Sequence, residues 1–470
     1  MKKELTFGVI VGNRGFFPSH LILKGRETIL SILEQHGIKT VALGLEDTKN
    51  GGISTIDDAT RCAKLFRANR DEIDGILVTL PNFGDEKAVS DAIRLSELNV
   101  PVLVHAFDDD MTRMTSLDRR DSFCGKLSLC NNLNQYGIPF TLTELHTVNP
   151  EEESFQKDLQ NFAAVCRIVK GLRYVRVGAL GARPTNFNTV RYSEKLLERS
   201  GIAVDTLDLS EAFGRASRLK DDDPALVAKL EEIKEYTRTS GVPNLSLQRM
   251  ARLGAVIDQW METNQLTITA LQCWTSMEQY YGITPCTLMS MMSNKLMPSA
   301  CETDVTGVLS MYALSLASGE PSALLDWNNN YGQDRIKAVF FHCSNLPAAF
   351  FEQKPTMGYS EIFAGDVGQE NAYGTLSGRI KSGAFTYCRL STNDFDGSIQ
   401  AYMGEAEFTN DPMSTFGGYG VAEVPRLQEL MKFVCRSNFE HHVAANISKV
   451  ADPLEEAFVR YLKWSVYRHN

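Results

Sequence analysis

Short apolar segments alternate with amphipathic helical segments through the first third of this 470-residue chain. Strand-like composition is found in residues 7–11, 40–43, 75–80 and 101–105. Helical spacing of apolar residues is found between them, in residues 19–36, 56–70 and 86–98. This alternation predicts a parallel sheet with helices on both faces, because parallel neighbours need a crossover connection. We therefore expect a doubly wound α/β domain over residues 1–168.

The same texture continues for another domain's length and then changes. Strand-like residues 174–178, 204–209 and 266–274 again alternate with helical segments, which predicts a central α/β domain over residues 169–332. From about residue 333, short strands separated by Gly, Asp and Asn predict a β-rich C-terminal domain over residues 333–470. The expected fold class is thus α/β, with two Rossmann-like, doubly wound parallel-sheet domains followed by a β-rich one. Several domains are expected at this length, because one core stops growing near about 250 to 300 residues.

Charge and cysteine usage exclude several classes of protein. Lys and Arg number 48 and Asp and Glu 58, so the formal charge of -10 disfavours a general nucleic-acid or anionic-membrane binder. No apolar run approaches the roughly 18 residues of a membrane span, and the apolar stretch near the start is too short for a signal peptide. The ten cysteines include no Cys-x-x-Cys pair, so neither a disulfide framework nor a zinc ribbon is expected. Reduced thiols of this kind favour a cytoplasmic location.

Carboxylates and imidazoles are set into mostly apolar segments of the last 170 residues. They are Glu302, Asp304, Asp326, His342, His441 and His442. Carboxylate and imidazole ligands suit Mn²⁺, Mg²⁺, Fe²⁺ or Co²⁺, which indicates a catalytic site on a divalent cation. Alternatively, Glu302 and Asp304 cap a helix that begins just after them, where acidic side chains favour an N-terminus. The residues alone leave both interpretations open.

Five segments together resemble the L-fucose isomerase and L-arabinose isomerase superfamily, in its fucose-isomerase-like branch. They are residues 300–307 (ACETDVTG), 325–329 (LDWNN), 341–343 (FHC), 11–18 (VGNRGFFP) and 440–443 (EHHV). The resemblance implies a three-domain, metal-dependent aldose-ketose isomerase that acts on a free open-chain sugar by enediol proton transfer. It also implies a homo-oligomer, a hexamer or trimer, with the active site near a subunit boundary.

Carried over by position, the resemblance assigns Glu302 and Asp326 as the catalytic carboxylates and, with His442, as the metal ligands. Mn²⁺ is the expected cation. In the arabinose-type pattern both acids are glutamates and a histidine follows the second, whereas here the second acid is Asp326 and His342 comes sixteen positions later. Supporting positions beside the ligands are then expected for Asp304, His342 and His441.

Substrate contacts are expected from Arg14, Gln272, Trp274 and Trp327. Arg14 follows the first strand, where α/β sheets place ligands, and an arginine there suits a sulfonate; a surface arginine is the alternative. The tryptophans suit a sugar face or, equally, a core. The resemblance favours a C6-modified hexose, with conversion of sulfoquinovose to sulfofructose or of L-fucose to L-fuculose. An L- or D-arabinose isomerase, a non-catalytic sugar-binding protein and a metal-dependent hydrolase remain alternatives.

Overall fold

The computed structural model describes residues 4–470, so the first three residues of the predicted N-terminal domain lie outside it. The chain forms two compact units. The first comprises the described residues through Lys170 together with Asp452–Lys463, and the second comprises Gly171–Ala451 together with Trp464–Asn470. Across residues 4–470, none of the helices has both the length and the apolar character that a membrane crossing requires.

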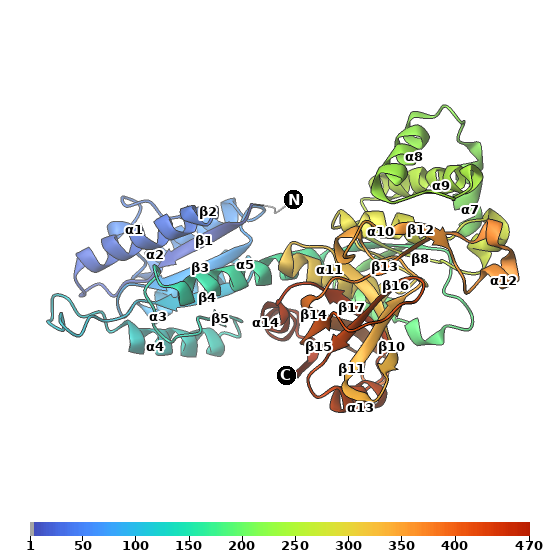
Figure 1. Cartoon of the computed structure of the whole chain (residues 1–470). Helices are drawn as coiled ribbons and strands as arrows, with labels where there is room; N and C mark the ends of the chain where they lie inside the picture. The colour runs from blue at the N-terminus through green and yellow to red at the C-terminus, as the bar shows by residue number, and fades with distance from the viewer. Residues whose placement is uncertain (1–3) are drawn as a thin grey trace. The chain divides into compact units, whose positions relative to one another are not determined.

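The first unit is built on a parallel five-stranded sheet in the order β2-β1-β3-β4-β5. Its strands are β1 (Thr6–Val11), β2 (Lys39–Ala42), β3 (Gly75–Leu80), β4 (Val102–Ala106) and β5 (Thr141–Leu142). Its helices are α1 (Ser19–Gln35), α2 (Ile56–Ala68), α3 (Glu86–Ser96), α4 (Ser122–Gln135) and most of α5 (Glu153–Arg173). Figure 1 shows the part of this unit that runs through Lys170 in blue to green. The predicted parallel, helix-flanked sheet is confirmed.

Alternate residues of these strands enter two separate cores, one on each face of the sheet. Ile10 and Ile76 pack with residues of α2, α3 and α4, whereas Val9 and Leu77 pack with residues of α1 and α5. This division follows from the two-residue period of a strand, and it explains why β1 and β3 are buried along their whole length. Helix α3 begins at a side-chain cap, because Asp85 accepts a hydrogen bond from the N–H of Ala88.

The second unit contains a parallel four-stranded sheet in the order β7-β6-β8-β9. Its strands are β6 (Arg176–Leu180), β7 (Ala203–Leu207), β8 (Ile268–Leu271) and β9 (Ser299–Ala300). Its helices are α6 (Glu194–Arg199), α7 (Leu209–Arg218), α8 (Pro224–Tyr236), α9 (Asn244–Thr263), α10 (Cys286–Asn294) and α11 (Val305–Ser318). Because parallel strands end at one edge, the segments beginning at Gly181, Gln272 and Cys301 emerge together there.

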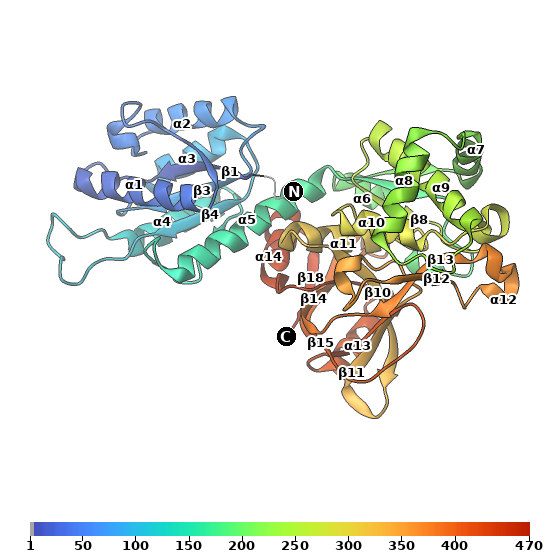
Figure 2. The ribbon, with the colours of Figure 1, turned by 45° about the horizontal axis from the view of Figure 1, so that its top comes forward.

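The rest of the second unit is a nine-stranded sheet in the order β12-β13-β16-β11-β10-β17-β14-β15-β18. The strands are β10 (Ser322–Tyr331), β11 (Asp334–His342), β12 (Thr356–Tyr359), β13 (Tyr373–Arg379), β14 (Gly383–Asn393), β15 (Ser398–Thr409), β16 (Gly418–Glu423), β17 (His442–Asn446) and β18 (Ser465–His469). Because β15 also pairs with β16, the six strands from β16 to β15 close into a barrel. Figure 2 shows β10, β11, β14 and β15 grouped in the orange-to-red part of the chain.

The predicted β-rich C-terminal structure is confirmed, but it begins at Ser322 rather than near residue 333. Asp326 therefore lies on the first barrel strand. Residues 398–403 and 406–409, two short segments of strand-like composition, are joined in one strand, β15. Gly404 between them does not end the strand; a Cβ there would stand 2.3 Å from the Tyr387 hydroxyl oxygen, so the glycine permits close packing. The limits of the three expected domains stay a prediction.

Near the C-terminus, α14 (Ala451–Glu456) is followed by the π-helical turn η6 (Ala457–Leu462). These residues belong almost entirely to the first unit. There, the Tyr461 hydroxyl bonds the backbone of Val102 on β4 and lies 2.8 Å from the Thr141 hydroxyl on β5. A helix near the C-terminus thus completes the N-terminal α/β unit.

Candidate active site

Four segments of the second unit bring the predicted carboxylates and histidines to one place. Glu302 follows β9, Asp326 lies on β10, His342 ends β11, and His442 begins β17. Strand β10 pairs with both β11 and β17, and the register sets Asp326 directly opposite His442. Residues directly opposite each other across antiparallel strands have neighbouring side chains. Residues more than a hundred positions apart in the sequence are therefore adjacent.

The two predicted carboxylate ligands, Glu302 and Asp326, each lie beside the predicted imidazole ligand, His442. Donor atoms lie within 4.8 Å of one another in two sets, Glu302–His342–His442 and Asp326–His441–His442. His442 Nε2 is 3.3 Å from Asp326 Oδ1 and 3.7 Å from Glu302 Oε2. Within the described part of the chain, Glu302 Oε2 and Asp326 Oδ1 are buried and have no hydrogen-bond partner. Two carboxylate oxygens without hydrogen bonds are costly to bury unless positive charge lies beside them. An arrangement of two carboxylates and an imidazole nitrogen fits a divalent cation such as Mn²⁺.

The neutral form of His442 is oriented by Asp304. His442 Nδ1 lies 2.8 Å from Asp304 Oδ2, so Nδ1–H donates to that carboxylate and the Nε2 lone pair faces Glu302 and Asp326. Metal-binding histidines are commonly held this way by a carboxylate on the far nitrogen. Burial alone would lower the pKa of His442, but the hydrogen bond to Asp304 and the charge of Asp326 raise it.

Asp304 itself is held from three sides at complete burial. It caps α11 by accepting from the N–H of Gly307 at 2.8 Å, as expected for an acid before this helix. Arg389 on β14 donates to both of its oxygens, at 2.6 and 3.0 Å, and also donates to Glu440 at 3.0 Å. Burial would raise the pKa of Asp304, but the charge of Arg389 and the bond from His442 hold it well below its usual range.

Arg389 and Glu440 were not predicted as members of the site. Arg389 is fully buried, and Glu440 is almost so. The only signal in the sequence is an arginine inside the otherwise apolar and small-residue run of residues 385–391. A charge in such a run requires a buried partner. The partners of Arg389 are distant in the sequence: Glu440 is 51 positions away and Asp304 is 85 positions away.

His342 faces the site as a hydrogen-bond donor. Its Nδ1 accepts from the backbone N–H of Cys343 at 2.9 Å, which leaves the ring proton on Nε2. Nε2 lies 3.7 Å from Glu302 Oε2. A metal ligand must offer a lone pair, so this arrangement favours the supporting position predicted for His342. The other oxygen of Glu302, Oε1, accepts from Trp274 Nε1 at 3.0 Å.

His441 borders the site and is more exposed than His442. Its side chain is 41% exposed, and its Nε2 lies 3.6 Å from Asp326 Oδ1. Burial of part of the ring and the neighbouring His442 lower the pKa of His441 to about 4. Phe187, in the segment that follows β6, packs edge-on against His441 and also contacts Trp274 and His442. Phe187 and Trp274 thus form an apolar wall beside the polar ligands.

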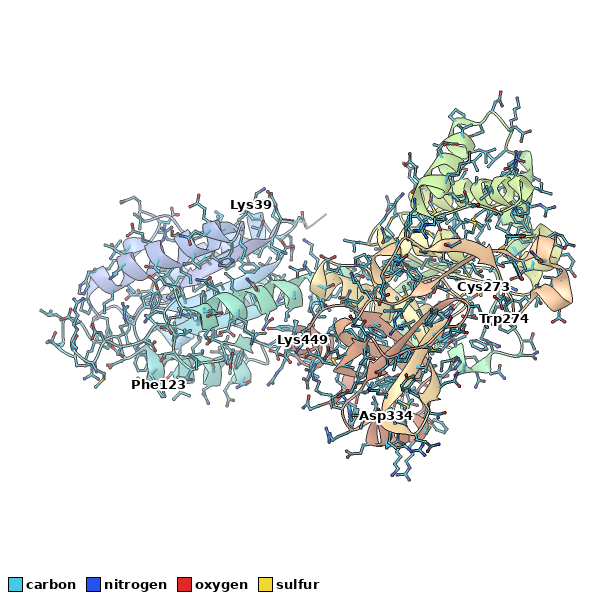
Figure 3. All side chains as sticks on the ribbon, in the orientation of Figure 1. Lys39, Phe123, Cys273, Trp274, Asp334 and Lys449 are labelled. Atoms are coloured by element: carbon cyan, nitrogen blue, oxygen red, sulfur yellow. The ribbon has the colours of Figure 1, made fainter. Side chains whose placement is uncertain are left out.

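The predicted substrate-contacting residues of the second unit differ in their surroundings. Trp274, labelled in Figure 3, stacks on Phe363 and reaches Glu302. Gln272 is nearly buried, and its Oε1 accepts from the N–H of Ala182 at 2.8 Å. Trp327 donates from Nε1 to the Tyr402 hydroxyl and packs against the main core. Trp274 is therefore the best placed of the three for contact with a sugar.

Arg14 lies in the first unit, just after β1. Its Nε donates to the Gly84 carbonyl at 3.1 Å, and its guanidinium forms an ion pair with Glu86 and lies 4.1 Å from the centre of the Phe83 ring. About a quarter of its side chain remains exposed. Its role in substrate binding stays a prediction.

A cleft of about 670 Å³ adjoins the ligand loops. Thr303, next to Glu302, and Glu440, next to His441, both line it. Arg183 and Arg191, from the segment that follows β6, line another part. The cleft therefore offers two arginines, alongside the acids Asp394 and Glu440, next to the residues that flank the proposed ligands.

Comparison with known proteins defines the class. Residues 8–173 match the family model "Fucose/sulfoquinovose isomerase, N-terminal domain", and residues 340–469 match "L-fucose isomerase, C-terminal domain". Sulfoquinovose isomerases from Priestia aryabhattai and Priestia megaterium are each 22% identical over 339 residues, which cover 72% of this chain and 74% of theirs. A sulfoquinovose isomerase from Alkalicoccus urumqiensis is 26% identical over 196 residues, 42% of this chain and 44% of its own.

Together with the fold, these matches define an isomerase of sugars. The chain belongs to the fucose and sulfoquinovose isomerase family, as its motifs predicted.

Proposed function

We propose that this chain is a divalent-metal-dependent aldose-ketose isomerase that converts free sulfoquinovose to sulfofructose through an enediol. One observation carries the proposal: Glu302 Oε2 and Asp326 Oδ1 are buried, have no hydrogen-bond partner among the described residues, and lie 3.7 and 3.3 Å from the Nε2 atom of His442. The sulfonated substrate is proposed because the curated relatives are named for it.

Glu302, Asp326 and His442 would hold the cation, and their oxygen and nitrogen donors suit Mn²⁺. When bound, such a cation acts as a Lewis acid toward the charge that develops on the sugar oxygens during isomerisation. Asp304 would contribute indirectly, by keeping the His442 proton on Nδ1 and thus the Nε2 lone pair free.

Isomerisation moves a proton between C1 and C2 of the open-chain sugar, so the site needs a group that removes a carbon-bound proton and one that returns it. We assign these roles to Glu302 and Asp326, the two carboxylates beside His442, as the family resemblance implies. His342 Nε2–H faces Glu302 and would hold that carboxylate in position. The wall formed by Phe187 and Trp274 would limit the access of water to the reacting carbons.

The anionic end of the sugar requires charge-assisted donors, and arginine matches the geometry of a sulfonate best. Arg183 and Arg191 in the adjoining cleft are one candidate pair. Arg14 is the other candidate, and it would act in the site of a neighbouring subunit. We accordingly propose a cytoplasmic homo-oligomer, a trimer or hexamer, with active sites near subunit boundaries. L-fucose is the second candidate substrate, followed by L- and D-arabinose.

The test is a screen of free aldoses with protein that has been stripped by a chelator and reloaded with Mn²⁺. We expect ketose formation from sulfoquinovose at a higher kcat/KM than from L-fucose or either arabinose, and none without a cation. Tight sugar binding without turnover would instead indicate a sugar-binding protein. Hydrolysis of a sugar derivative, tested in parallel, without ketose formation from the free aldoses would indicate a hydrolase. Turnover of every sugar by the metal-free protein would refute the metal dependence.

Variants test the assignment of residues. Glu302→Gln and Asp326→Asn should each abolish turnover while circular dichroism shows an unchanged fold. Glu407→Gln, on an exposed position of barrel strand β15, is the matched control and should retain activity. Near-normal turnover in either site variant would contradict the assignment.

A further inference from the structure

Four cysteines from separate segments converge beside the proposed active site. Cys273 follows β8, Cys286 begins α10, Cys301 follows β9, and Cys343 follows β11. The sulfur atoms of Cys286, Cys301 and Cys343 lie within 4.8 Å of one another. Cys273, labelled in Figure 3, belongs with Cys301 and Glu302 to a second group of the same spacing. Cys273, Cys286 and Cys301 are fully buried, and Cys343 is partly exposed.

This cluster differs from the buried cysteines of the first unit. Cys62 and Cys166 are each a member of an apolar core of the first unit, where a thiol behaves as a small apolar group. The Cys301 thiol, by contrast, interacts with those of Cys273, Cys286 and Cys343. The sequence contains no Cys-x-x-Cys pair, so only the fold brings these thiols together.

The spacing of the three sulfur atoms fits a metal ion. Zinc-sulfur bonds of about 2.3 Å in a tetrahedral site put the sulfur atoms about 3.8 Å apart. Sulfur atoms already within 4.8 Å need to move by less than about 1 Å to reach that separation. Thiolates prefer soft cations such as Zn²⁺ and Cu⁺, whereas Mn²⁺ prefers carboxylate and imidazole. The cysteine cluster and the Glu302 set therefore differ in the cation they select.

A buried acid near the cluster is a second, independent observation. Both carboxylate oxygens of Glu278, on the π-helical turn η3 (Met277–Tyr281), are buried without a hydrogen-bond partner in the described part of the chain. Burial, with a smaller contribution from the charge of Cys343, raises the pKa of Glu278 to about 8. A cation bound nearby would favour the charged form of such a buried carboxylate.

We propose that Cys286, Cys301 and Cys343 form a second metal site, which binds one soft cation such as Zn²⁺. The cation replaces the thiol protons, which are released to solvent, so no oxidant or reductant takes part. It would tie the start of α10 and the loop after β9 to barrel strand β11. This inference stands independently of the proposed isomerase reaction, because the Glu302, Asp326 and His442 donors are not part of it.

The test uses Cd²⁺ as the probe on the full-length, reduced protein, with Mg²⁺ in excess to occupy the carboxylate set. Exposed Cys124 and Cys435 are first replaced by serine, because they would bind the probe nonspecifically. We expect ultraviolet cadmium-thiolate absorption that saturates at one equivalent of Cd²⁺, together with a rise in the unfolding temperature, because an ion that binds only the folded state stabilises it.

In the same background, Cys286→Ser should weaken Cd²⁺ binding at least tenfold, whereas Cys62→Ser and Glu302→Gln should leave the absorption unchanged. Cys343→Ser gives the same test if circular dichroism shows that Cys286→Ser is misfolded. Absence of the absorption in the reduced protein would overturn the proposal, and so would full binding by both folded serine variants. Because the readout is spectroscopic, loss of isomerase activity in Glu302→Gln does not affect it.

Discussion

Replacing Asp304 by asparagine tests how the buried network supports the metal ligands. The change keeps the size of the side chain and its capability to cap α11, because asparagine caps helices about as well as aspartate. It removes the negative charge that Arg389 contacts through two hydrogen bonds at complete burial. Glu440 remains as a partner of that arginine, so Arg389 keeps part of its compensation.

Two effects of different size are expected from Asp304→Asn. Removing one partner of a buried ion pair typically costs about 3 to 5 kcal/mol of stability, and the lower end applies here because Glu440 remains. The amide also no longer specifies a proton on His442 Nδ1, and loss of such a partner typically weakens metal binding about 10- to 100-fold. That loss corresponds to roughly 1.4 to 2.7 kcal/mol of binding free energy.

Urea unfolding would measure the first effect, and electron paramagnetic resonance of free Mn²⁺ the second. The matched control is Asp85→Asn, which replaces the acid that caps α3 in the first unit. It should change stability by only a few tenths of a kcal/mol. Unchanged Mn²⁺ affinity in Asp304→Asn would refute the argument that Asp304 orients a metal-binding histidine.

Three further predictions follow from the contacts of single residues. His442→Asn should abolish Mn²⁺ binding, whereas His342→Asn should lower kcat and leave most of the Mn²⁺ affinity, because His342 Nδ1 accepts from the Cys343 N–H; equal losses of Mn²⁺ affinity would contradict this difference. Burial lowers the pKa of His105 in the first unit from 6.5 to about 3, so the unfolded chain binds the extra proton first as the pH falls below 6.5. At pH 5 this linkage removes about 2 kcal/mol of stability relative to pH 8. Urea unfolding at pH 8 and pH 5 should show a smaller loss of stability in His105→Gln than in the wild type. The exposed-site control, His20→Gln, should lose as much stability as the wild type. An equal loss in all three proteins would argue against the role of His105. Arg14→Ala should lower kcat/KM more for sulfoquinovose than for L-fucose, and equal losses for both sugars would exclude a contact with the sulfonate.

The local parts of the fold could be predicted from the sequence, and the long-range pairings could not. The strands near Val9, Leu77 and Leu103 have apolar, β-branched runs bounded by turn residues, and these short-range signals place β1, β3 and β4 correctly. Closure of the barrel depends on the pairing of β15 with β16, which no local pattern encodes. The extent of β10 was also not evident from the sequence, because its residues 328–330 are polar and exposed although they belong to the strand.

The same distinction applies to the site. Glu302, Asp326 and His442 were identified because family motifs surround them, and the pairing of β10 with β17 brings two of them together. Arg389 gave only a weak signal, since a buried arginine needs partners that the sequence does not reveal. The cysteine cluster gave none, because its members come from four segments that meet only in the folded second unit.

Deuterium exchange tests the central claim most directly. Sulfoquinovose incubated in D₂O with the Mn²⁺-loaded protein should be recovered partly as aldose with one deuterium at C2, as measured by mass spectrometry, because proton transfer through an enediol exchanges that hydrogen. Glu302→Gln and the metal-free protein should give unlabelled aldose. Ketose formed without any deuterium in either sugar, or full labelling by the Glu302→Gln variant, would contradict the assignment of Glu302 and Asp326 to proton transfer.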